Sequence, residues 1–108
     1  MTTHRVKSWP RAFADVLTGR KRFEVRRDDR SPPYVAGDVV VLLEFNPAPA
    51  ATSSDPGPEG FTGRKATYRI GYIQRGAPNP PGFCAFDLVS MEDWQRFTAA
   101  IPEGIDVG

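Results

Sequence analysis

Residues 19–30 read Gly-Arg-Lys-Arg-Phe-Glu-Val-Arg-Arg-Asp-Asp-Arg, which places six cationic and three acidic side chains in twelve positions. Within this stretch, residues 22–27 alternate between polar and apolar side chains, and this alternation predicts a half-buried strand. We expect Phe23 and Val25 to face the core and Glu24 and Arg26 to face the other way. Interleaved charges of both signs suit a small polar ligand better than a long duplex backbone. The alternative is a sheet face covered by salt bridges.

A helix is predicted before this stretch. Ser8 is expected to cap it, Pro10 suits its first turn, and Gly19 suits its end. The residues that would form its buried stripe follow helical spacing. They are Trp9, Phe13, Val16 and Leu17.

Further strands are predicted on both sides of a low-complexity segment. A short strand over residues 4–7 comes first, and the apolar run at 39–45 predicts a strand buried on both faces. Residues 65–74 and 83–89 complete the strands. A second helix should start at a capping box over residues 90–93 and face inward with Trp94, Phe97 and Ile101. The spacers are too rich in proline for crossover helices, so we expect an α+β fold with a small, mostly antiparallel, curved sheet or barrel flanked by two or more short helices.

The length of 108 residues predicts one domain over 1–108, with a flexible loop at 46–60 and a short tail at 102–108. No apolar run is long enough for a membrane span, and the first residues lack an apolar signal segment. The single cysteine, Cys84, excludes an internal disulfide, and we expect its thiol to be buried and inert. These features predict a cytoplasmic protein with no metal and no cofactor.

Charge is divided unevenly along the chain. Residues 1–30 contain nine Lys or Arg against four Asp or Glu, whereas residues 31–108 contain five against nine. This division predicts one basic surface, although a solvated face without a partner is the plain alternative. His4 is the only histidine, so a mechanism that needs two histidines is excluded.

Several segments resemble the DUF3850 branch of the ASCH families, within the PUA-like superfamily. They are residues 4–7, 19–30, 35–38, 42–44 and 61–64. The resemblance implies a PUA-like β-barrel, and relatives of that fold bind RNA or modified bases in a cleft beside the barrel. Other ASCH proteins are ribonucleases.

One ASCH relative is an amidohydrolase that removes the acetyl group of N4-acetylcytidine. Lys21 matches its catalytic lysine, but its catalytic threonine falls at Glu24, which lacks the hydroxyl nucleophile. Its catalytic glutamate has no clear counterpart, and Glu44 and Asp87 are the candidates.

The sequence therefore predicts a domain that holds RNA, a nucleoside or a nucleotide in a basic cleft. Lys21, Arg26 and Arg30 would bind phosphate or a carbonyl group. Glu24 would position them or accept a hydrogen bond from a base amine. His4 and Lys7 would line the edge of the cleft. The alternatives are a nucleoside hydrolase or ribonuclease that uses Lys21 and Glu24 as acid and base, and a non-catalytic protein-interaction module. The sequence leaves open the ligand, the oligomeric state and whether turnover occurs.

Overall fold

A computed structural model describes residues 1–46 and 60–99 of the chain. Its elements are β1 (Thr3–Ser8), α1 (Pro10–Leu17), β2 (Phe23–Arg27), β3 (Val39–Phe45), β4 (Phe61–Arg69), β5 (Ile73–Arg75), β6 (Phe83–Asp87), β7 (Val89–Ser90) and α2 (Met91–Ala99). All but the two end residues of the predicted loop at 46–60, and the whole predicted tail at 102–108, lie outside the described residues. In the part described, neither helix has the length and apolar character that crossing a membrane requires.

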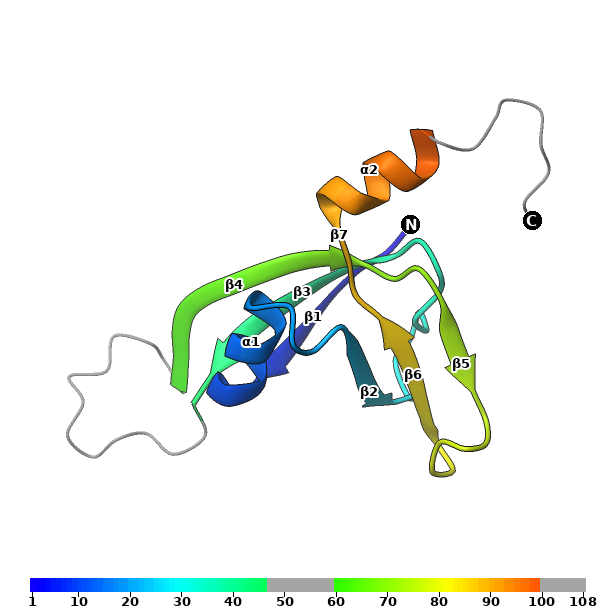
Figure 1. Ribbon diagram of the computed structural model, residues 1–108. Helices are drawn as coiled ribbons and strands as arrows, with labels where there is room; N and C mark the ends of the chain where they lie inside the picture. Colours follow the sequence, from blue (N-terminus) through cyan, green and yellow to red (C-terminus); the bar gives the residue numbers. More distant parts are fainter. Residues whose placement is uncertain (47–59, 100–108) are drawn as a thin grey trace.

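The strands form two sheets, in the orders β1-β3-β4-β7 and β2-β6-β5 (Figure 1). The β1–β3 pair is parallel, and the other four strand pairs are antiparallel. The α+β class and the mostly antiparallel pairing are therefore confirmed.

The expected closed barrel is wrong. In the described residues no ladder joins the two sheets, because β2 pairs only with β6 and β1 pairs only with β3. The chain passes between the sheets through residues 70–72 and through Leu88, without forming strands there. Edges of both sheets are left open, and barrel closure needs a continuous ring of backbone hydrogen bonds.

Helix α1 packs against the larger sheet through Phe13 and Val16, which are buried as expected. Trp9 and Leu17 are 63% and 47% exposed, so the predicted stripe is narrower than expected. The N-cap is Trp9 and not Ser8, because Ser8 completes β1. The Ser8 hydroxyl is buried and has no hydrogen-bond partner in the described part of the chain.

Strand β2 alternates as predicted, but its faces are reversed. Glu24 is only 3% exposed, whereas Phe23 and Val25 are 54% and 45% exposed. The register explains part of this reversal, since Glu24 lies opposite buried Phe86 on β6 and Val25 lies opposite partly exposed Ala85. Side chains directly opposite each other share a face of the sheet. The inner face of β2 is therefore its polar face.

The core lies between the two sheets and α1. Its buried members include Val6, Phe13, Val40, Leu42, Ile70, Cys84 and Phe86, with Tyr34 from the loop before β3. Cys84 is fully buried, as predicted. Burial, together with the negative charge of Asp28, raises the pKa of its thiol above the ordinary value.

In the C-terminal half, the boundaries of the strands differ from the predicted ones. The strand expected at 65–74 is two strands, β4 and β5, and Tyr72 between them is 66% exposed. The strand expected at 83–89 is β6 and β7, which belong to different sheets. The backbone N–H of Asp93 donates to the Ser90 hydroxyl at 3.0 Å, which confirms the predicted cap of α2. Trp94 is partly buried, and the side chains of Phe97 and Ile101 lie outside the described residues.

Candidate ligand-binding site

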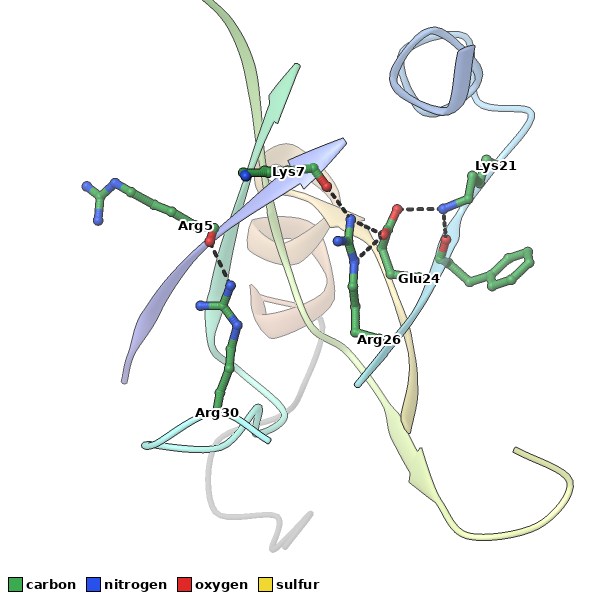
Figure 2. A network of polar contacts seen from close by, with 7 residues as sticks. Arg5, Lys7, Lys21, Glu24, Arg26 and Arg30 are labelled. Carbon is green, nitrogen blue, oxygen red and sulfur yellow. Dashed lines mark hydrogen bonds and ion pairs between the residues drawn. The ribbon is translucent and has the colours of Figure 1, made fainter. Parts of the chain in front are cut away.

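The carboxylate of Glu24 lies between two cations (Figure 2). Lys21 Nζ donates to Glu24 Oε2 at 2.5 Å, and Arg26 Nε donates to Glu24 Oε1 at 2.8 Å. The Glu24 side chain is 4% exposed, whereas the side chains of Lys21 and Arg26 are each 26% exposed. Glu24 is therefore the buried centre of an ion triad whose two cations reach the surface.

Local geometry explains why these three residues meet. Residues two apart in a strand share a face, so Glu24 and Arg26 both point inward from β2. Lys21 precedes the strand, and its backbone N–H donates to the carbonyl of Asp15 in α1 at 3.0 Å. Its ammonium reaches back to Glu24 and also donates to the Phe23 carbonyl at 2.7 Å. The turn after α1 thus brings Lys21 to the inner face of β2.

Two arginines bridge the gap between the edge strands β1 and β2. Arg26 Nη2 donates to the Lys7 carbonyl at 2.7 Å, and Arg30 Nη2 donates to the Arg5 carbonyl at 2.8 Å. The two guanidiniums reach across from β2 and from the loop after it, while the side chains of Arg5 and Lys7 extend from β1 away from them (Figure 2). Side-chain bonds therefore span the opening that a closed barrel would fill with backbone bonds.

A hollow of about 370 Å³ lies at this opening. We call it the basic hollow, and its lining residues are Arg5, Val6, Lys7, Arg26, Arg27, Asp29, Arg30 and Tyr34. Five of these eight residues are cationic and one is acidic. Burial raises the pKa of Tyr34 although Arg30 and Arg26 act against the shift, so this phenol remains protonated and able to donate.

Lys21 lies at a different hollow, of about 430 Å³, between the end of α1 and the segment around β7. We call it the lysine hollow. Its lining also includes Arg22, Tyr68 and Asp93, and residues 16–19 and 88–90. Lys21 and Arg26 therefore share Glu24 but open toward separate hollows, and Glu24 lines neither of them. The sequence predicted one cleft for all three residues.

His4 does not lie at an accessible cleft edge, which corrects the prediction. It is 3% exposed, and its Nε2 lies 2.8 Å from Asp38 Oδ2. Asp38 also accepts from the backbone N–H groups of Thr2 and Val35, both at 3.0 Å. Burial alone would raise the pKa of Asp38, but these hydrogen bonds outweigh it and hold the pKa below the ordinary value. His4 points inward because even-numbered residues of β1 face the core.

Lys7 lies at the basic hollow, where it contributes its carbonyl and not its ammonium. Its ammonium lies 4.5 Å from the centre of the Phe45 ring, on the outer face of the larger sheet. Alternation along β1 turns Lys7 outward and the neighbouring Ser8 inward.

The two candidates for a second catalytic acid have other partners. Glu44 is buried and accepts from the Thr62 hydroxyl at 2.7 Å, with Arg64 at 3.7 Å. Asp87 Oδ1 accepts from the backbone N–H groups of Gly71 and Tyr72, at 2.7 and 2.8 Å. In the described part of the chain, neither carboxylate forms a hydrogen bond or ion pair with Lys21.

Besides Val6, four residues of the basic hollow were not singled out from the sequence as ligand-binding residues. They are Arg5, Arg27, Asp29 and Tyr34. Tyr34 carried a usable signal in the sequence, since it is a large aromatic residue in a polar, proline-containing loop, and the structure shows it to be 1% exposed. Arg5, Arg27 and Asp29 gave no such signal. Their place at the hollow depends on how the loop after β2 folds back toward β1.

Comparison with known proteins places these observations in a family. A family model described as "Domain of unknown function (DUF3850)" matches residues 3–88. This range runs from β1 to the residue after β6, so it includes every residue of the ion triad and of the basic hollow. No curated protein matches the chain.

Proposed function

The chain belongs to the DUF3850 family, and from the geometry of its site we propose that it binds RNA or a nucleotide, with a phosphate group in the basic hollow. The observation that carries the proposal is that the guanidiniums of Arg26 and Arg30 are held at the hollow, where Asp29 is the one acidic lining residue. Such an excess of one charge at a concave surface attracts an anion.

The arginines of the hollow are held in place before a ligand arrives. Carbonyls of β1 fix Arg26 and Arg30, so little side-chain freedom is lost on binding. Each guanidinium has five N–H donors in a planar fork that matches phosphate. Carbonyl contacts and Glu24 occupy only some of these donors, and the remainder can bind phosphate oxygens.

The size of the hollow favours a nucleotide or a single strand. Its volume of about 370 Å³ falls within the range of about 300–1,000 Å³ that is typical of small-molecule sites. A duplex backbone would need an extended row of cations, whereas Arg26 and Arg30 are gathered between two strand edges. The resemblance to ASCH proteins supports the same ligand class.

The test is binding of a fluorescent single-stranded RNA to the parent and to Arg30→Ala. Arg30 is exposed and forms one carbonyl bond, so the variant should fold normally and lose about tenfold in affinity. Arg11→Ala is the matched control, because Arg11 is an exposed arginine on α1 away from the hollow. Equal affinity in all three proteins would contradict the proposed site.

A second candidate function is hydrolysis of a modified nucleoside or of RNA. It is favoured by the 2.5 Å contact between Lys21 and Glu24 beside the lysine hollow. In this reading the Lys21 ammonium stabilises developing negative charge on the substrate, and Glu24, which lines neither hollow, acts as the base through one water molecule. The substrate that tests it is N4-acetylcytidine, alongside short RNA, with release of acetate or of shorter RNA as the readout.

A further inference from the structure

The outer face of the β2-β6-β5 sheet is apolar and open to solvent. Phe23 and Val25 of β2 are 54% and 45% exposed. Across the ladder, Ala85 lies opposite Val25 and Phe83 lies opposite Arg27, and both are partly exposed. We call Phe23, Val25, Phe83 and Ala85 the outer aromatic face. It exists because Glu24 and Arg26 occupy the inner side of β2.

Each phenylalanine of this face has a cation beside its ring. Lys21 Nζ lies 5.4 Å from the centre of the Phe23 ring, and the Arg27 guanidinium lies 5.3 Å from the centre of the Phe83 ring. Arg27 is also one of the residues that line the basic hollow. The outer aromatic face and the basic hollow therefore meet at Arg27.

We propose that the outer aromatic face stacks the bases of single-stranded nucleic acid whose phosphate lies in the basic hollow. The inference rests on the proposed function and specifies its ligand as an unpaired strand. Aromatic side chains interleaved with cations are the arrangement that single-strand binding uses, because every base has a flat face and every linkage has a charge. Phe23 and Phe83 stack bases, while Lys21 and Arg27 contact the linking phosphates.

The charges on the face favour nucleic acid over a second copy of the chain. A two-fold interface brings the same patch against itself, so Lys21 and Arg27 would approach the same cations of the other copy. Asp87 is the acidic residue opposite Phe23, and its Oδ1 is already bonded to two backbone N–H groups. A strand of phosphates meets these cations with opposite charge.

The experiment compares two probes, a short single-stranded RNA and the same ribose-phosphate chain without bases. Phe23→Ala should weaken binding of the RNA by about tenfold, from a stacking contribution of about 1–3 kcal/mol per base. It should leave binding of the abasic chain unchanged. Phe23→Leu keeps apolar area but removes the ring, and it should lose nearly as much affinity for RNA. Trp9→Ala is the matched control, since Trp9 is a 63% exposed aromatic residue at the start of α1.

The outcomes separate this inference from the proposed function. Equal RNA affinity of Phe23→Ala and the parent, with weaker binding by Arg30→Ala, would overturn base stacking and leave the basic hollow standing. Full affinity in Phe23→Leu would also overturn stacking, because it would assign the effect to apolar area alone. Dimerisation of the parent that Phe23→Ala abolishes would assign the face to a second copy. Failure of the parent to bind either probe would overturn both proposals.

Discussion

Two buried carboxylates in this molecule are held in different ways. Asp38 and Glu24 are 5% and 3% exposed. Asp38 accepts hydrogen bonds from two backbone N–H groups and lies 2.8 Å from the buried ring of His4. Glu24 is held by the side chains of Lys21 and Arg26, which are each 26% exposed. The two carboxylates are buried to a similar extent. Backbone N–H groups and a buried histidine hold Asp38, whereas two partly exposed side chains hold Glu24.

The difference separates a structural carboxylate from one at a candidate site. Backbone N–H groups cannot leave Asp38 without local unfolding, so Asp38 ties the N-terminal strand to the turn before β3. Lys21 and Arg26 border hollows and can redirect donors to a ligand while Glu24 still holds them. Exchangeable side-chain donors around a buried charge are therefore the more useful sign of a binding site in this fold.

The largest expected effect is on stability, in Asp38→Asn. The amide keeps one acceptor oxygen and adds an N–H₂ group, so buried donors lose their partners and the protein should lose about 3 kcal/mol of unfolding free energy. Glu24→Gln should lose only about 1 kcal/mol, because its two cations can turn to solvent. Urea unfolding measures both variants, with exposed Asp29→Asn as the control. Equal losses in Asp38→Asn and Glu24→Gln would remove the distinction between the two carboxylates.

The next effect separates binding from hydrolysis at Glu24. A binding site that uses Glu24 to orient Lys21 keeps part of its affinity in Glu24→Gln, since the amide oxygen still accepts. A hydrolase that needs the carboxylate as a base should lose about a hundredfold or more in turnover while still binding. Lys21→Ala should abolish turnover, because the ammonium that stabilises the developing charge is lost, and should weaken RNA binding. The assays are binding and hydrolysis of N4-acetylcytidine and of short RNA. A Lys21→Ala variant that matches the parent in both assays would show that Lys21 and its hollow take no part in function.

Salt should weaken RNA binding by a smaller and graded amount. With about three phosphate contacts, the slope of log K against log salt should be near −2, from about 0.7 per phosphate. A fourfold rise in salt should then lower affinity by about fifteenfold. Arg30→Ala should reduce the slope by about 0.7, whereas Phe23→Ala should leave it unchanged. A slope near zero in the parent would show that phosphate neutralisation does not drive binding.

The smallest expected effect is the loss, in acid, of the stability that ionised Asp38 contributes. Its folded pKa lies below the ordinary value of 3.8, so its contribution to stability is fully present above that value. The contribution is lost as the pH falls through the folded pKa, because the unfolded chain takes up the proton first. The gap in unfolding free energy between the parent and Asp38→Asn should therefore narrow from neutral to acid pH. A stability gap that stays constant into strong acid would contradict the lowered pKa.

Much of the local structure could be predicted from the order of residues. Helix α1, its termination before Gly19, the cap at Ser90 and the central run of β3 follow from glycine, proline and hydrophobic spacing. Lys21, Glu24 and Arg26 were singled out because charges of both signs interleave there, and the structure brings them into one triad. The predicted boundaries of the strands were wrong where the chain crosses from one sheet to the other, at residues 70–72 and at Leu88.

The sequence by itself determined the alternation in β2, since a period of two is a property of extended backbone. Only the tertiary structure decided which side of that strand is buried. Lys21 and Arg26 neutralise Glu24 on the inner side, and arginine side chains bridge β1 and β2 where no ladder forms. Hydrophobicity alone would bury Phe23 and Val25, but pairing with β6 and these charged bonds place Glu24 inside. Long-range contacts therefore determine which face of β2 is buried, and with it where the candidate site lies.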